Sequence, residues 1–212
     1  MKKIFLIFII FVIQFSSLVS KEPKLEEILS GLERPWSLSF VDNSKILVTE
    51  KQGNFFLADL KNNNLSKINH NLNILVDGQG GLLEVLYSGE NVFVSYSENR
   101  GKGKSSTSVA RASFNKKELK FKNIFRSEPP INSGYHFGSR LVIKDNLLYI
   151  TAGERGEGMI AQDPTKHPGS IIRIHLDGKI PKNNPKFKGK ENWLPEIFQI
   201  GVRNPQGMDL SP

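Results

Sequence analysis

The chain has 212 residues, 24% of them charged, a formal net charge of +8 and no cysteine. Without cysteine it can form no disulfide framework. Of its 29 basic residues, 21 are lysines, scattered singly or in pairs and without the interleaved aromatic residues of a nucleic-acid surface. We therefore expect a globular protein with solvated basic faces and no nucleic-acid partner.

The N-terminus, MKKIFLIFIIFVIQFSSLVS, combines two lysines, an apolar run from Ile4 to Ile13 and a small, polar exit that ends at Ser20. This order is typical of a secretory signal peptide. The apolar run is shorter than the roughly 20 residues that span a bilayer, which disfavours the alternative of an uncleaved membrane anchor. We predict a signal peptide over residues 1–20, export to the periplasm or the medium, no stable membrane insertion, and one domain over residues 21–212.

After a brief helical fragment at residues 25–29 (LEEIL), short or alternating apolar runs broken by Asp, Asn and Gly predict strands throughout. Three stretches repeat one pattern, in which a strand, a tight turn and a second strand follow one another. The turns are Asp42-Asn43, Ser88-Gly89 and Asp145-Asn146. A third strand follows each pair (NFFLADL, SSTSVARASF and SIIRIHLDG), and KELKFKNIF supplies a fourth strand in the second repeat.

The repeats start at Trp36, Gly81, Gly138 and Gly207, with separations of 45, 57 and 69 residues. The long loop KIPKNNPKFKGKENWLPE lengthens the last interval. Antiparallel units of roughly 40–50 residues with four strands are typical of a β-propeller, and the repeat favours that fold over a β-sandwich, the alternative for short strands. Residues 208–210 are predicted to begin the inner strand of a fourth blade. We therefore expect an all-β chain with about three and a half blades of a truncated propeller.

Polar residues precede each repeat start by two to four positions. They are Arg34, Gln79, His136, and Arg203 with Asn204. In a propeller the first strand of each blade lies along the axis, so the loops that enter these strands converge at one end of it. Each residue alone has an ordinary structural explanation, but their shared phase in the repeat favours a small-molecule site.

His136 is the member of this set that can act as a base at neutral pH, whereas Arg203 and Asn204 can polarise a carbonyl oxygen. Glu154, which follows His136 by 18 residues in TAGERG, would lie at the end of the neighbouring strand and could fix the tautomer of the imidazole. A carboxylate in a surface turn is the equal alternative for Glu154. The sequence has no Walker loop, zinc-ligand spacing or nucleophile elbow, so harder chemistry would need an imported cofactor.

Six segments occur in the order LERPWSLSF…ILVTEKQG, DGQGGLLEV, HFGSRLVI, TAGERG, HPGSIIRIHLDGKIPKNNP and PEIFQIGVRNPQGMDL. Together, from about residue 32 to residue 212, they resemble the soluble PQQ-dependent glucose and aldose sugar dehydrogenases. The resemblance implies a six-bladed propeller that binds pyrroloquinoline quinone (PQQ) on its axis with calcium. It also implies oxidation of the anomeric hydroxyl of aldose sugars to lactones, with electrons passed to an external acceptor.

By motif, the resemblance implies that His136 is the general base and Glu154 its acidic partner. It assigns Arg203 and Asn204, in RNPQG, to binding of the quinone, and Gln79 to the same pocket. The calcium ligands are expected beyond residue 212, so the chain alone is expected to be inactive.

The chain departs from the family pattern at two positions. Val202 stands where many members have a histidine, and Tyr135 stands where the glucose dehydrogenases have an aspartate. Tyr135 favours the aldose sugar dehydrogenase branch and argues against a preference for glucose.

Two other functions stay open from the sequence. One is a propeller that binds a ligand without catalysis. The other is a metal-dependent lactone or ester hydrolase, which would need a cage of carboxylates and asparagines where the loops offer only Asn204. The sugar, the electron acceptor and the oligomeric state are not specified by these residues.

Overall fold

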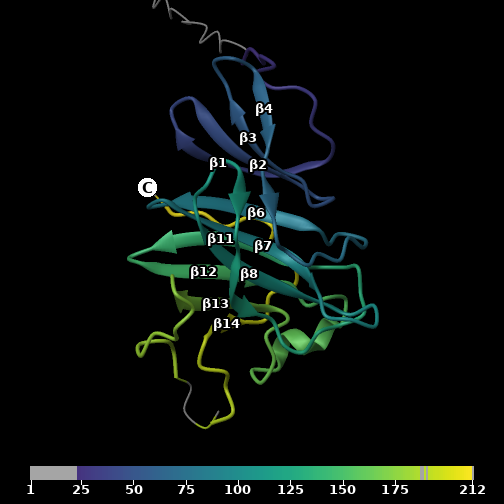
Figure 1. The fold of residues 1–212 in the computed structure, drawn as a ribbon. Helices are drawn as coiled ribbons and strands as arrows, with labels where there is room; N and C mark the ends of the chain where they lie inside the picture. Colours follow the sequence, from purple (N-terminus) through teal and green to yellow (C-terminus); the bar gives the residue numbers. More distant parts are fainter. Residues whose placement is uncertain (1–22, 187–188, 190, 212) are drawn as a thin grey trace, which may run out of the picture.

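The computed structural model describes residues 23–186, 189 and 191–211, so the predicted signal peptide lies outside the described residues. Three antiparallel sheets of four strands each follow one another along the chain (Figure 1). The first contains β1 (Pro35–Asp42), β2 (Lys45–Glu50), β3 (Phe55–Asp59) and β4 (Asn64–Lys67). The second contains β6 (Leu82–Ser88), β7 (Asn91–Asn99), β8 (Ser105–Ser113) and β10 (Lys122–Arg126). The third contains β11 (Gly138–Lys144), β12 (Leu147–Ala152), β13 (Ser170–His175) and β14 (Ile197–Ile200).

Two short elements complete the described part. The parallel pair β5 (Asn69–His70) and β9 (Glu118–Leu119) joins the first sheet to the second. A 3-10 helix, η1 (Gly158–Gln162), lies between β12 and β13. None of the helices in the described ranges is long and apolar enough to cross a membrane.

The three sheets are blades of a β-propeller, which confirms the predicted fold. Each predicted strand–turn–strand repeat forms the first two strands of one sheet, and the sheets stack face to face with β1 against β6 and β6 against β11 (Figure 1). Each first strand carries a register irregularity against its partner near its start, after Pro35, Leu82 and Gly138 respectively. The three blades therefore repeat down to the position of a bulge.

The period-2 alternation of the middle strands fills the space between blades. Along β7, Val92, Val94 and Tyr96 face the first blade, where they pack with Leu47 and Phe55. The opposite face of the second blade presents a different set, which packs with the third blade in one apolar cluster. That cluster contains Phe93, Val109, Phe125, Leu141, Leu148, Ile150, Ile172, Ile174 and Ile197. The core of the described residues thus has two layers between blades, and a smaller cluster of Ile46, Val48 and Ala58 lies in the first blade.

A hydroxyl group on the second strand links each blade to the next. The hydroxyl of Thr49 on β2 donates to the carbonyl of Leu83 on β6 at 2.6 Å. The hydroxyl of Ser95 on β7 donates to the carbonyl of Ser139 on β11 at 2.6 Å. Thr151 on β12 donates to the carbonyl of Pro205 at 2.8 Å. Because the donors are equivalent, the segment around Pro205 occupies the place that β6 and β11 occupy beside the preceding blade.

Three predicted elements differ from the structure. Residues 25–29 form no helix, since five residues are too few to propagate one; instead Leu29 packs on Ile46 and Val48 of the first blade. Residues 208–210 lie where a fourth inner strand was predicted, but they pair with no strand in the described part of the chain and so have no strand hydrogen bonding. Of KELKFKNIF, only residues 122–126 join the second blade, because Glu118–Leu119 pairs with β5.

The inter-blade hydroxyl of Ser95 also accepts a hydrogen bond from the backbone N–H of Glu84 at 3.0 Å. The change Ser95→Ala leaves this N–H and the carbonyl of Ser139 buried without that partner, so we expect the free energy of unfolding to fall by about 1–3 kcal/mol. Urea-induced unfolding of the complete gene product measures it. Ser113→Ala, at the exposed end of β8, is the matched control and should stay within about 0.5 kcal/mol of the parent. Equal stabilities for the two variants would contradict the assigned role.

Candidate functional site

The structure brings His136 and Glu154 together at one end of the blades. Nδ1 of His136 lies 2.7 Å from Oε1 of Glu154, whose side chain is only 5% exposed. The second carboxylate oxygen accepts the backbone N–H of Gly156. Since a carboxylate can only accept, Nδ1 carries the proton and Nε2 is left as the basic nitrogen. Nε2 forms no hydrogen bond with any described residue, so it is the atom that can exchange a proton with a ligand.

Gln79 and Asn204 reach the same place from other blades. Oε1 of Gln79 accepts the backbone N–H of His136 at 2.9 Å and lies 3.5 Å from Nδ2 of Asn204. Oδ1 of Asn204 accepts the backbone N–H of Gly138 at 2.9 Å. Both amide oxygens are thus used within the protein. The NH₂ group of Asn204 also donates one hydrogen bond, to Gln79, so its second N–H and the NH₂ group of Gln79 are the amide donors left for a ligand.

Arg203 joins the cluster through its backbone more firmly than through its side chain. Its carbonyl accepts the N–H of Glu154 at 2.8 Å, whereas its Nε lies 3.8 Å from Oε1 of that residue and the side chain is 79% exposed. An ion pair so exposed contributes little to stability. The guanidinium is therefore a positive group beside His136 with most of its donors unused.

Arg34 does not join the cluster, although it has the predicted repeat phase. Its carbonyl accepts the N–H of Lys51 at 3.1 Å, as that of His136 accepts the N–H of Arg155 at 3.3 Å, and both Arg34 and His136 have a φ of 52°. The backbones are therefore equivalent. The side chain of Arg34 is exposed, and no hydrogen bond or ion pair among the described residues joins it to the other predicted residues. The loop of Arg34 thus has the predicted equivalent position, while its side chain makes no contact with the cluster.

The backbone of the loop around His136 is strained and tightly packed. A φ of 52° places a non-glycine residue in the left-handed region, at a cost of about 1–2 kcal/mol. Two glycines make this course possible. A Cβ on Gly153 would lie 2.0 Å from the carbonyl oxygen of His136, and one on Gly138, whose φ is 65°, would lie 2.8 Å from the nitrogen of Gly153. Strain of this kind is typical of positions that the surrounding structure holds for function.

Sequence reasoning missed Arg155, a further member of the site. It is 2% exposed, and burial lowers its pKa to about 10, so it stays charged at neutral pH. Its guanidinium donates to the carbonyls of Tyr135 and Ser133, in the loop that carries His136, and to the carbonyl and hydroxyl of Ser105 on β8. Carbonyl acceptors have no sequence signature, so nothing in the sequence marked this arginine.

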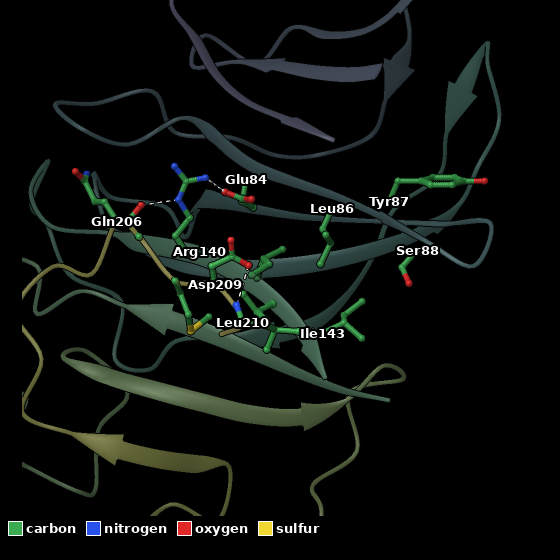
Figure 2. A pocket seen from close by; sticks show the side chains of 13 residues that line it. Glu84, Leu86, Tyr87, Ser88, Arg140, Ile143, Gln206, Asp209 and Leu210 are labelled. Carbon is green, nitrogen blue, oxygen red and sulfur yellow. Dashed lines mark hydrogen bonds and ion pairs between the residues drawn. The ribbon is translucent and has the colours of Figure 1, made fainter. Parts of the chain in front are cut away.

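A cavity of about 680 Å³ lies along the inner strands β6 and β11 and residues 206–210 (Figure 2). Arg140 crosses its wall, where it pairs with Glu84 and donates from Nε to the carbonyl of Gln206 at 2.5 Å. Burial raises the pKa of Glu84, and the charge of Arg140 opposes that rise. His136 and Glu154 do not line this cavity; Gln206, from the RNPQG segment, does. Within the described ranges, no three or more His, Cys, Asp or Glu residues group as a metal site would require.

The sequence is similar to that of known proteins. The family model described as glucose / sorbosone dehydrogenase matches residues 32–212. The chain belongs to this family. It is 32% identical to aldose sugar dehydrogenase YliI of Escherichia coli (strain K12) over 198 residues, which cover 89% of this chain and 53% of that protein. It is 27% identical to quinoprotein glucose dehydrogenase B of Acinetobacter calcoaceticus, in an alignment that covers 94% of this chain and 48% of that protein.

A solved structure extends the comparison to three dimensions. The soluble aldose sugar dehydrogenase (Asd) from Escherichia coli in the apo-form superposes with a TM-score of 0.82 at 32% identity, covering 88% of this chain and 56% of that chain. The chain spans about half the length of the curated relatives it matches. Membership in the glucose / sorbosone dehydrogenase family and the propeller fold predicted from the sequence are therefore both confirmed.

The tautomer of His136 can be tested directly by ¹⁵N NMR of the complete gene product, labelled at histidine. At a pH where the imidazole is neutral, we expect protonated Nδ1 and bare Nε2. His167 is an internal control with the opposite tautomer, because its Nδ1 accepts the N–H of Glu128 at 2.8 Å and its Nε2 faces Glu196 at 2.9 Å. In Glu154→Leu, which lacks the acceptor, the Nε2-protonated form of His136 should become populated. A wild-type spectrum with Nε2 protonated would exclude the assigned hydrogen bond.

Proposed function

We propose that this protein is an exported quinoprotein that oxidises the anomeric hydroxyl of aldose sugars. The observation that supports this most is the buried His136–Glu154 pair, which leaves Nε2 as a base, together with the N–H donors of Arg203, Asn204 and Gln79 that the protein does not use. A base and several donors at one point suit removal of a hydroxyl proton and stabilisation of the charge that develops. Membership in the glucose / sorbosone dehydrogenase family supports the same reaction class.

His136 carries the proton step. Nε2 accepts the proton of the anomeric hydroxyl as that carbon becomes the carbonyl carbon of a lactone. The ring is then an imidazolium, which the carboxylate of Glu154 stabilises across the 2.7 Å contact at Nδ1. Because Glu154 is buried and also accepts the N–H of Gly156, the carboxylate keeps its orientation while the ring charge changes.

The donor set fits the cofactor that the resemblance implies. Pyrroloquinoline quinone, when bound, supplies an ortho-quinone that takes up the hydride from the anomeric carbon. The amide NH₂ groups of Asn204 and Gln79 and the guanidinium of Arg203 are donors only, as quinone oxygens and carboxylates require. One relative bears the name quinoprotein glucose dehydrogenase. In our proposal, Arg203 and Asn204 hold the quinone oxygens and Gln79 lines the same pocket.

Calcium, export and the electron acceptor belong to the same proposal. Calcium prefers six to eight oxygen ligands, and we propose that these come from outside the described residues. The predicted signal peptide at residues 1–20 would direct the protein to the periplasm or the medium, where an external acceptor receives the electrons.

Reconstitution tests the function. The complete gene product, purified without cofactor, should gain dye-reducing activity toward aldoses when PQQ and calcium are added. His136→Ala should lower kcat by about 10²–10⁴-fold because it removes the base, while His175→Ala, at the exposed end of β13, should not. Absorbance titration with PQQ identifies a propeller that binds the quinone without reducing it on addition of sugar. Lactone hydrolysis that depends on a divalent metal, with no dye reduction, would replace the proposal with the hydrolase alternative.

A further inference from the structure

Arg155 has an unusual environment for a charged side chain. It is 2% exposed, yet no carboxylate among the described residues forms an ion pair with it. The nearest negative charges, on Asp77 and Glu154, act on its pKa only through space. A buried charge without a paired countercharge is costly, and an apolar side chain would fill the same space at lower cost. The guanidinium is therefore retained for the hydrogen bonds that it donates.

Those hydrogen bonds hold the loop before β11. Nε donates to the carbonyl of Tyr135 at 3.0 Å, and Nη2 donates to the carbonyl of Ser133. The backbone N–H of Arg155 donates to the carbonyl of His136 at 3.3 Å. The guanidinium also stacks on the ring of Phe137, with 3.8 Å from Cζ to the ring centroid. One residue thus contacts four of the five residues from 133 to 137.

The guanidinium of Arg155 is also anchored on a buried strand. Nη1 and Nη2 donate to the carbonyl and the hydroxyl of Ser105 at 2.8 and 2.9 Å. Ser105 is the first residue of β8 and is 1% exposed. The guanidinium therefore ties the loop of the third blade to a buried strand of the second. A lysine could not do this, because its single ammonium cannot reach three acceptor residues in one plane.

The hydrogen bonds of Arg155 fix the loop that contains the strained residue His136. A left-handed φ persists at a non-glycine residue only when its surroundings determine it. Gln79 fixes the N–H of His136 and Glu154 fixes the ring. The backbone N–H of Arg155 holds the carbonyl of His136, and Arg34 has the same φ of 52° beside Lys51 with this backbone bond alone. What the guanidinium adds is the placement of Ser133 and Tyr135, just before His136. Without the guanidinium bonds this part of the loop can shift, which would move Nε2 away from the donors of Asn204 and Arg203.

We propose that Arg155 is a positioning residue that sets the orientation of the His136 imidazole. The inference rests on the proposed function for its kinetic consequence, because it takes His136 as the base. The claim that Arg155 orients the imidazole does not depend on that function, and the ¹⁵N signals of His136 test it directly.

The test compares Arg155→Lys with Arg173→Lys in the complete gene product. Arg173 is a matched control: it is 8% exposed, it stacks on Phe198 at 4.9 Å, and its guanidinium anchors a loop through Asn183 and Asn184. Both changes should lower thermal stability. Only Arg155→Lys should alter the ¹⁵N signals of His136, by populating the Nε2-protonated tautomer. With PQQ, calcium and an aldose, kcat should fall about 10–100-fold for Arg155→Lys, as expected for a displaced base, with KM changed less than kcat.

The readouts separate the two claims. If Arg155→Lys alters the His136 signals while the wild type shows no dye reduction, the result would support the positioning role and count against the proposed function. Unchanged His136 signals and kcat in Arg155→Lys, with a stability loss equal to that of Arg173→Lys, would overturn the positioning role. If Arg155→Lys does not fold, Ser105→Ala is the milder change. It removes one acceptor of Nη2 and should shift the His136 signals in the same direction, and their constancy would also overturn the role.

Discussion

One buried hydroxyl in each blade sets the position of the next inner strand, and the site depends on that spacing. The bulge at the start of each inner strand leaves backbone groups without strand partners, and buried backbone groups must be bonded. A hydroxyl can both accept and donate. Ser95 accepts from Glu84 in its own blade and donates to Ser139 in the next, and Thr151 repeats the pattern with Arg140 and Pro205. Successive loops therefore arrive at the same height, so Gln79, His136 and Asn204 meet although 125 residues separate the first and the last.

The repeat allowed much of the fold and part of the site to be predicted, because in a propeller a shared phase means a shared place. The positions of Gln79, His136 and Asn204 follow from this symmetry. Arg34 shows its limit: the phase specifies the backbone, down to a φ of 52° that it shares with His136, but not the direction of a long side chain. Residues 208–210 show a second limit, since an apolar pattern predicts a strand only where another strand can pair with it. Arg155 could not be predicted at all, because its partners are mostly carbonyls, which every residue has.

The segment from Arg203 to Gln206 explains how groups can be fixed for a ligand without a strand to hold them. Each of its four residues makes one hydrogen bond to the third blade. The carbonyl of Arg203 accepts from Glu154, the side chain of Asn204 from Gly138, the carbonyl of Pro205 from Thr151, and that of Gln206 from Arg140. Three of these four bonds use main-chain carbonyls, and the fourth uses only the amide oxygen of Asn204. The segment is thus fixed mainly by its acceptors. Asn204 also donates one N–H to Gln79, and its second N–H and most donors of the Arg203 guanidinium stay unused.

This division between acceptors and donors runs through the whole cluster. Gln79 uses its amide oxygen internally, and Glu154 uses both carboxylate oxygens, one on the ring of His136 and one on Gly156. What remains for a ligand is the NH₂ group of Gln79, the second N–H of the Asn204 amide, the guanidinium of Arg203 and the bare Nε2 of His136. A ligand rich in acceptor oxygens that also carries an acidic hydroxyl meets a complementary partner for each of its groups, and water is a poor substitute because the donors are already oriented. The backbone bonds that stabilise the loops are therefore the same bonds that select the chemistry the site can perform.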